Sequence, residues 1–153
     1  MAKRLDTEIL IDAPAERVWS VLMEFAAYPE WNPFIQQIQG EAKVGTTLTV
    51  TMEPPKKNKM TFQPKVLVVK ENTEFRWLGH TVFPGLFDGE HVFQLEKRDN
   101  GTCFIQREKF RGMLVPLIMA MIGSATRNGF EEMNQALKER VEQLDGSSDN
   151  GEA

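Results

Sequence analysis

The feature that most constrains this chain is the order of its hydrophobic patterns: many strand-like segments come first, and one long helical segment follows. Between residues 34 and 111, apolar and polar residues alternate with the period of two that is typical of half-buried strands, and turn residues separate the segments. Residues 114–144 then repeat apolar side chains at helical spacing. This order predicts an α+β fold in which an antiparallel sheet covers a single C-terminal helix.

The N-terminal part adds one strand and two short helices. Alternation over residues 5–11 predicts a half-buried strand. Pro14 and the acidic Glu16 then indicate the start of a short amphipathic helix. Its apolar positions are Val18, Val21, Leu22 and Phe25. Pro29 and Pro33 limit a second helix to a turn or two before the next strand.

The last two strands are predicted to form a hairpin around Asn100–Gly101. A two-residue turn at that pair leaves Glu108 diagonal to His91 on the same face of the sheet, whereas a four-residue loop places the two directly opposite. A three-residue loop would turn Glu108 to the other face, because side chains alternate between faces along a strand.

Composition indicates one folded domain with a polar tail. Leu, Ile, Val and Phe make up roughly a quarter of the 153 residues, which is enough for a packed core. We expect a single domain over residues 1–144. Residues 145–153 contain no large apolar side chain and carry Asp145, Asp149 and Glu152, so they are predicted to form a disordered acidic tail.

Charge and residue usage exclude several partners and locations. A formal net charge of −4 argues against nucleic-acid binding. The longest apolar stretch, Met113–Ile122, is too short to span a bilayer, so stable membrane insertion is not expected. A single cysteine, Cys103, and an N-terminus with no signal-like apolar run predict a cytoplasmic protein. With only two histidines and no metal-ligand spacing, we expect no metal and no cofactor.

Several short motifs are shared with a known superfamily. They are Ile11-Asp12-Ala13-Pro14 with Val18-Trp19, the segment Tyr28 to Phe34, Phe75-Arg76-Trp77 with Gly79, His91 to Leu95, Glu108 to Gly112, and Gly129-Phe130 with Met133-Asn134 and Ala136-Leu137. On these residues the chain resembles the START-like helix-grip (SRPBCC) superfamily over roughly residues 3–143, and within it the polyketide cyclase/dehydrase-like branch.

The resemblance implies a helix-grip fold, with a curved antiparallel sheet of six to seven strands wrapped around the long C-terminal helix. It also implies a cavity between sheet and helix. The superfamily includes lipid carriers, hormone receptors, allergens that bind apolar ligands, and cyclases, so it does not imply one activity.

Candidate ligand-binding residues follow from strand parity and from this expected cavity. Aromatic walls with adaptable methionines suit a flat or oily ligand. The candidates are Trp31, Phe62, Phe75, Trp77, His91, Phe93, Phe104, Gln106, Glu108, Phe110, Met119 and Phe130. The alternative for the apolar members is an ordinary filled core, and the alternative for Trp31 is a structural anchor.

The polar candidates His91, Gln106 and Glu108 are predicted to face inward, where a polar group needs a hydrogen-bonding partner. They could anchor a ligand hydroxyl or carbonyl. His91 and Glu108 could also act as a general acid/base pair, and they are the catalytic candidates. The structural alternative is a satisfied polar pair with no role in binding.

Three function hypotheses follow. The first is a non-enzymatic protein, a monomer or weak homodimer, that binds a small apolar or aromatic molecule, lipid-like or polyketide-like. The second is a polyketide cyclase, dehydratase or lyase that works without a metal and uses His91 and Glu108. The third is a protein- or membrane-interaction module that uses the outer sheet face or residues 113–122, although burial of that segment by helix packing is the simpler interpretation.

Overall fold

Eight strands, three α-helices and one short 3-10 helix make up the described part of this chain. The structure is a computed structural model that describes the backbone of residues 2–80 and 84–151 and the side chains of 3–80 and 84–144. The elements are β1 (Ala2–Ile11), α1 (Ala15–Met23), η1 (Phe25–Ala27), α2 (Tyr28–Trp31), β2 (Ile35–Gln39), β3 (Thr49–Met52), β4 (Met60–Phe62), β5 (Lys65–Lys70), β6 (Glu74–His80), β7 (Asp88–Arg98), β8 (Gly101–Arg111) and α3 (Val115–Gly151).

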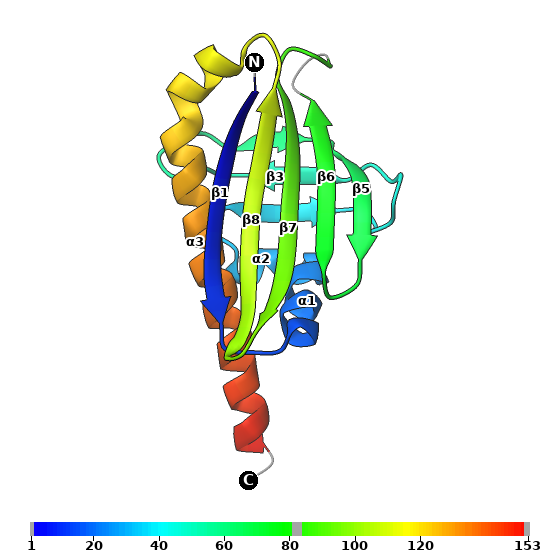
Figure 1. Cartoon of the computed structure of the whole chain (residues 1–153), viewed down its shortest axis with the longest axis vertical. Helices are drawn as coiled ribbons and strands as arrows, with labels where there is room; N and C mark the ends of the chain where they lie inside the picture. The colour runs from blue at the N-terminus through cyan, green and yellow to red at the C-terminus, as the bar shows by residue number, and fades with distance from the viewer. Residues whose placement is uncertain (1, 81–83, 152–153) are drawn as a thin grey trace.

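The strands form two antiparallel sheets. Five of them pair in the order β1-β8-β7-β6-β5, and the other three pair as β2-β3-β4. Figure 1 shows the three-stranded sheet crossing behind the five-stranded one at a steep angle. Backbone hydrogen bonds join the two layers where Leu48 N donates to Pro64 O and Val66 N donates to Thr46 O. The sheets therefore enclose an interior rather than forming one flat surface.

Helix α3 closes this interior along one side. It runs the length of the molecule beside β1, against which it packs most extensively (Figure 1). Its buried stripe is Phe130, Met133, Leu137 and Val141. The architecture is the predicted α+β helix-grip fold, with short helices after the first strand.

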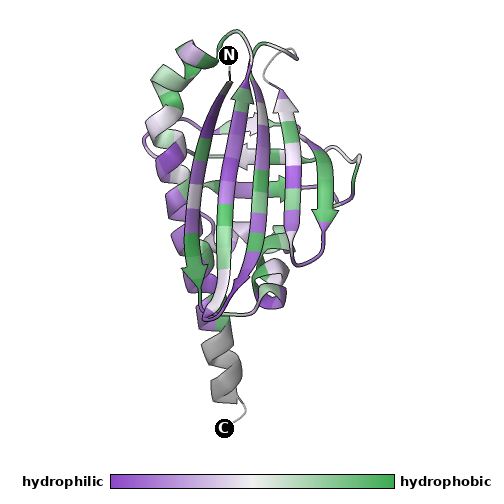
Figure 2. Cartoon of the chain, viewed as in Figure 1, coloured by the Kyte–Doolittle hydropathy of each residue, from purple (hydrophilic) through white to green (hydrophobic). Residues whose placement is uncertain are grey.

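Side-chain alternation accounts for the way the strands pack. Figure 2 shows hydrophobic and hydrophilic residues alternating along β6, β7 and β8. On β6, Phe75 and Trp77 are fully buried, whereas Glu74 and Arg76 are only partly so. Long apolar side chains on one face of each strand supply the hydrophobic burial that stabilises the sheet.

Three details differ from the sequence-based expectations. The structure has eight strands in two sheets rather than six to seven strands in one. Part of the difference is that residues 60–70 form two strands, β4 and β5, which pair in different sheets. Helix α3 extends to Gly151 rather than ending at 144, and residues 145–151 contain no proline that would end it earlier. The disorder expected for residues 145–153 stays a prediction.

The third difference is the register of the β7–β8 hairpin. Arg98 pairs with Gly101, so the turn is Asp99–Asn100 and His91 lies directly opposite Glu108. Gly101, directly after the turn, sits at φ 142°, a backbone conformation that favours glycine, and a Cβ there would overlap the carbonyl of Ile11 at the end of β1. Both the backbone conformation and the close approach of β1 therefore favour glycine at this position.

No helix in the described segments carries an apolar stretch long enough to cross a lipid bilayer.

Candidate functional site

The interior divides into a filled part and a hollow part. Phe75, Trp77, Phe93, Phe104 and Phe130 are at most 1% exposed and pack against one another in the core. The rings of Phe75 and Phe93 stack with centroids 5.9 Å apart, and Phe93 and Phe104 stack at 6.2 Å. This part of the interior is therefore an aromatic core.

The hollow part is a cavity of about 240 Å³ at the end of the molecule where α3 begins. Its walls come from the β3–β4 hairpin, from β6, β7 and β8, and from the first turns of α3. The lining residues are Phe34, Met52, Pro54, Met60, Thr61, Phe62, Gly79, His80, Phe87, Gly89, Glu108, Phe110, Ile118, Ile122 and Thr126. Most are apolar, so the cavity suits an apolar ligand.

The segment before α3 closes part of the cavity mouth. Met113 N donates to Gly85 O at 3.2 Å and Leu114 N donates to Leu86 O at 2.9 Å, which ties the β6–β7 loop to the start of the helix. Phe87 in that loop stacks on Phe110 with ring centroids 5.3 Å apart. Residues 84–87 of the loop are thus held against the segment before α3 and against β8.

Glu108 is a partly buried lining group that keeps spare hydrogen-bonding capacity among the described residues. Thr126 already donates its hydroxyl proton to Ile122 O at 2.8 Å, and His80 Nδ1 is 2.8 Å from Asp88 Oδ1. Glu108 Oε2 lies 3.2 Å from His91 Nδ1, while Oε1 has no hydrogen bond within the described part of the chain. A ligand in the cavity would meet this carboxyl group.

Behind Glu108 a buried chain of polar side chains leads away from the cavity. His91 Nε2 lies 2.9 Å from Gln106 Oε1, and Gln106 Nε2 donates to Asn134 Oδ1 at 2.8 Å. Asn134 Nδ2 donates to Thr7 Oγ1 at 3.0 Å. His91 and Gln106 are 0% exposed, so each hydrogen bond satisfies a group that water cannot reach.

The structure brings together only some of the predicted binding residues. Phe62, Glu108 and Phe110 line the cavity. Gln106 and His91 stand behind Glu108, and Met119 is buried on α3 without lining the cavity. Five other candidates, Phe75, Trp77, Phe93, Phe104 and Phe130, lie in the aromatic core. Their contact with a ligand stays a prediction.

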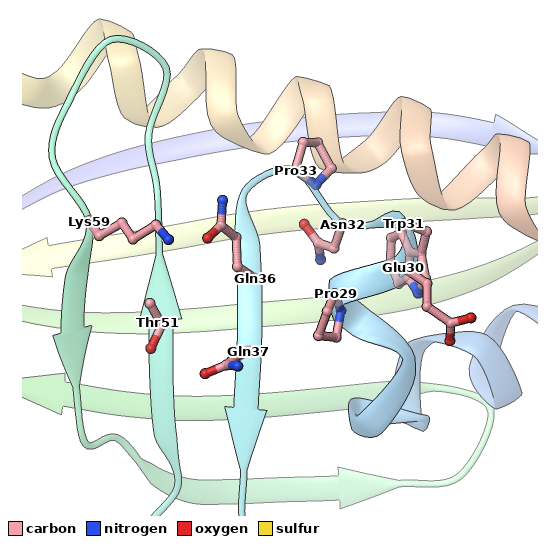
Figure 3. A pocket seen from close by; sticks show the side chains of 9 residues that line it. All are labelled: Pro29, Glu30, Trp31, Asn32, Pro33, Gln36, Gln37, Thr51 and Lys59. Carbon is pink, nitrogen blue, oxygen red and sulfur yellow. The ribbon is translucent and has the colours of Figure 1, made fainter.

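Trp31 lies elsewhere, in a polar groove of about 600 Å³ on the outside of the three-stranded sheet. Figure 3 shows Lys59, Thr51, Gln36 and Gln37 along this groove and Trp31 at its far end. The Trp31 ring also packs on Tyr28, with centroids 5.0 Å apart. This placement fits the structural-anchor alternative for Trp31.

Sequence reasoning assigned no role to Asn134 or Thr7, which complete the polar chain. One signal was available for Asn134. It stands four residues after Phe130 and three before Leu137, so a polar side chain interrupts the apolar stripe of the helix. A polar residue at such a position needs a buried partner, and the inward-facing Gln106 is that partner.

The Cys103 thiol and the possible metal-ligating side chains also bear on the chemistry. Burial raises the pKa of the Cys103 thiol, and a hydrogen bond from its Sγ to Glu8, 3.4 Å away, adds to the effect, so the thiol is a poor nucleophile. Among the described residues, no three His, Cys, Asp or Glu side chains converge to hold a metal ion.

Together, the sheets wrapped around α3 and the cavity beside the start of this helix define the protein's class: it has a START-like helix-grip fold. The sequence itself matches a family model over residues 2–142. The chain belongs to this family, described as polyketide cyclase/dehydrase and lipid transport.

Solved structures share the fold over nearly the whole chain. A START superfamily protein from Mycobacterium smegmatis is 22% identical, with 92% of this chain and 98% of that chain covered and a TM-score of 0.71. The protein TTHA0849 from Thermus thermophilus is 18% identical (93% and 99% covered, TM-score 0.73). A norcoclaurine synthase point mutant from Thalictrum flavum, in complex with a transition state analogue, is 14% identical (95% and 97% covered, TM-score 0.72). At these identities the likeness shows the fold. No protein of curated function matches the sequence.

Proposed function

We propose that this protein binds a small, largely apolar molecule in the cavity at the start of α3, without catalysing a reaction. The observation that carries the proposal is an apolar cavity of about 240 Å³ in which Glu108 has an unoccupied oxygen. Membership of a family whose description includes lipid transport supports the binding of an apolar molecule. Affinity would come mainly from apolar burial, at about 25 cal/mol per Å².

The size of the cavity limits the ligand. The cavity volume of about 240 Å³ lies below the roughly 300–1,000 Å³ that is usual for sites of drug-sized ligands. That volume fits a single ring with short substituents, and a long acyl chain would need the β3–β4 hairpin and α3 to move apart. We therefore propose a one-ring aromatic or alicyclic ligand rather than a full-length lipid.

A cavity-filling substitution tests this proposal. Ile122 lines the cavity and is half-buried, so Ile122→Trp should occupy the ligand volume. Leu117→Trp is the matched control, because Leu117 is 62% exposed on the same helix. Toluene binding, measured by NMR chemical-shift changes, should be lost in Ile122→Trp and kept in Leu117→Trp. Toluene that binds both variants equally would contradict the proposed site.

Native mass spectrometry of protein purified from its own host gives an independent test. A retained small molecule in the wild type, absent from Ile122→Trp, would identify the ligand directly. We also propose a cytoplasmic location, because a single cysteine suits a reducing compartment. We further propose that it is a monomer or weak homodimer, which sedimentation velocity over a range of concentrations would test.

The enzymatic alternative has one supporting observation, the direct contact between His91 and Glu108. Against it, His91 is fully buried with both ring nitrogens engaged, so only Glu108 could touch a substrate. A cyclase or dehydratase of this design would lose turnover of a polyketide-like substrate in Glu108→Gln while remaining folded. Turnover by the wild type that survives this substitution would remove His91 and Glu108 from the mechanism.

A second role, docking at a membrane surface, is favoured by the rim of the cavity. Residues 113–122 were expected to be buried by helix packing, but Met113, Leu117 and Met121 are 81%, 62% and 66% exposed. Only Val115 and Met119 in that stretch are buried, because the helix contacts the body of the protein along one face.

The charge beside this apolar face indicates the kind of surface it would meet. The β3–β4 hairpin, which forms the opposite wall of the cavity, carries the exposed cations Lys56, Lys57 and Lys59. Apolar side chains next to a cluster of lysines suit the surface of an anionic bilayer. We propose that the cavity mouth docks there to exchange its ligand.

Vesicle co-sedimentation tests the docking proposal. Binding should require anionic lipid, weaken as salt is raised, and fall in Leu117→Glu. The control is Val44→Glu, which changes another exposed apolar residue, 60% exposed and remote from the cavity lining. Equal binding to anionic and zwitterionic vesicles, or none to either, would overturn the proposal.

A further inference from the structure

Four buried side chains from four different elements form one connected hydrogen-bond chain. Thr7 is on β1, His91 on β7, Gln106 on β8 and Asn134 on α3. The donor–acceptor distances along the chain are 2.8 to 3.0 Å. Each member is buried, so its hydrogen-bonding choices are fixed by the other members and not by water.

Two backbone carbonyls set the direction of this chain, because a carbonyl oxygen can only accept. Thr7 donates its one hydroxyl proton to Gln106 O at 2.8 Å. Thr7 Oγ1 must then accept from Asn134, so the amide nitrogen of Asn134 faces Thr7 and its oxygen faces Gln106. The Gln106 amide nitrogen donates to that oxygen and also points at Phe130 O, 3.4 Å away.

The tautomer of His91 follows from the orientation of Gln106. The Gln106 side-chain oxygen faces His91 Nε2 at 2.9 Å, so Nε2 must carry a proton and donate it. The remaining nitrogen, Nδ1, faces Glu108 Oε2 at 3.2 Å. That contact needs one proton, on the imidazole or on the carboxyl group, and the pair is neutral overall in both arrangements.

We propose that Asn134, acting through Gln106, is a positioning residue that holds His91 as the Nε2–H tautomer, so that the proton-sharing His91–Glu108 pair presents a neutral anchor for a hydroxyl-bearing ligand. The ligand class rests on the proposed binding function, whereas the tautomer does not. A hydroxyl group can donate to the carboxylate or accept from the carboxyl group, so it suits both arrangements of the shared proton.

The surroundings of the cavity also argue against a charged ligand. The other ionisable group in the lining, His80, is already paired with Asp88. Glu108 is already charge-matched by His91, so a ligand charge would find no unpaired countercharge among the described lining residues, and an unpaired charge in an apolar cavity is strongly disfavoured. A phenol or a small alicyclic alcohol fits the volume and the polarity.

Nitrogen NMR tests the tautomer directly and needs no substitution. The chain has two histidines, so ¹⁵N-histidine labelling gives two sets of ring resonances, and His80→Gln assigns the set that belongs to His91. The proton-bearing nitrogen of a neutral imidazole is well separated from the bare one. We expect the His91 nitrogen that couples as Nε2 to be protonated. A bare Nε2 in the folded wild type would overturn the proposal.

Asn134→Leu tests the positioning role. Without its amide, Gln106 loses the partner that orients it, and the His91 resonances should change from one tautomer to an exchanging mixture. Asn128→Leu is the matched control, because Asn128 is exposed on the same helix. Thr7→Val, which removes the hydroxyl that orients Asn134, should act in the same direction. A folded Asn134→Leu or Thr7→Val variant with an unchanged His91 tautomer would show that Asn134 has no positioning role.

The ligand class is tested with two probes of nearly equal shape, p-cresol and toluene. If the anchor binds a hydroxyl, p-cresol should bind about tenfold more tightly than toluene, and the difference should vanish in Glu108→Leu. Equal binding of both probes to the wild type would overturn the hydroxyl preference. If neither probe binds, the binding function itself fails and the ligand class fails with it, while the tautomer result stands on the NMR data.

Discussion

Tyr28, the one tyrosine of the chain, shows how a single side chain can stabilise the end of a helix. It is 0% exposed, and its hydroxyl donates to Leu22 O at 2.6 Å. Leu22 lies in the last turn of α1, where backbone carbonyls lack partners within the helix. The Tyr28 hydroxyl therefore satisfies an acceptor that is otherwise buried and unpaired.

Burial also raises the pKa of the Tyr28 phenol above its ordinary value of 10.0. The folded protein keeps this proton after the unfolded chain has released it. Below pH 10 the phenol is protonated in both the folded and the unfolded state, so its contribution to the free energy of unfolding does not change with pH. Above pH 10 the unfolded chain releases the proton, and the free energy of unfolding falls as pH rises. We predict that phenolate absorbance appears only when the protein unfolds in alkali, as followed by circular dichroism.

Tyr28→Phe is the control for this titration, since it removes the signal. It should also lower the free energy of unfolding at neutral pH by about 1–3 kcal/mol, because the Leu22 carbonyl stays buried without a donor. A phenolate signal near pH 10 in protein that is still folded would contradict the assignment.

The polar side chains of the candidate site show which of their features the sequence predicts and which it does not. Alternation along the strands correctly predicted that His91, Gln106 and Glu108 face inward, because parity depends only on local geometry. The pairing of His91 with Glu108 depended on which two residues form the hairpin turn, and the structure has Asp99–Asn100 there rather than Asn100–Gly101. The contact between Gln106 and Asn134 joins residues 28 positions apart through tertiary packing, which no local pattern encodes.

At the scale of the element, Gly123 and Gly129 on α3 have opposite surroundings. A Cβ at Gly129 would overlap the ring of Phe34, which is fully buried and packs edge-on against Phe130 at 5.7 Å. A Cβ at Gly123 would meet nothing closer than Met119 Cε at 3.4 Å, an ordinary contact with a flexible side chain. Gly129 therefore permits close packing of the helix, and Gly123 does not serve that purpose.

Alanine substitutions should separate these two roles. Gly123→Ala should raise the free energy of unfolding by about 0.5–1 kcal/mol through better helix propensity. Gly129→Ala makes the same propensity gain but must displace Phe34, so it should lower stability by a net of about 1–3 kcal/mol. Urea denaturation of both variants measures the difference. Equal stabilisation by the two would mean that Phe34 can move freely.

Element types were easier to predict than their ends. The long helix and the alternating strands were found where their periods indicated, because amphipathic patterns record which face is buried. Alternation over residues 61–68 predicts one strand, but the chain divides there into β4 and β5, which pair in different sheets. The division into two sheets was also missed, because it depends on how the strands bend in space.

At the scale of the whole molecule, α3 continues beyond the part that packs on the sheet. Leu137 and Val141 are fully buried, whereas Leu144 is 42% exposed. Folding should therefore depend on the helix up to about Val141 and not on the polar residues after 144, which is also where the domain was predicted to end.

Two truncations test this boundary. A chain ending at Leu144 should keep its free energy of unfolding within about 0.5 kcal/mol of the full-length value. A chain ending at Ala136 should lose several kcal/mol, because two large buried side chains go with it. Calorimetry of the two truncated chains and of the full-length chain measures these stabilities. Amide hydrogen exchange in the full-length chain tests the predicted disorder of residues 145–153. A marked loss of stability on ending at Leu144 would extend the domain into the tail.

The existence of a cavity was predicted from the resemblance, but its extent was not. Sequence placed Phe62, Phe75, Trp77, Phe93, Phe104 and Phe110 on one inner face and could not say which of them fill space and which line it. That distinction depends on how the two sheets, the short helices and α3 pack in space, which the alternation along a strand does not record.

The position of the cavity bears on how such a protein can evolve. The residues that hold the fold gather in the aromatic core, while most cavity-lining residues lie on the β3–β4 hairpin, the β6–β7 connection and the first turns of α3. Mutations at lining residues outside the hydrophobic core, such as Met60, Ile118 and Ile122, can change ligand preference at little cost in stability, because few core contacts are disturbed. A lineage could thus acquire new ligands by drift at one end of the molecule, while selection for folding acts mainly on the other.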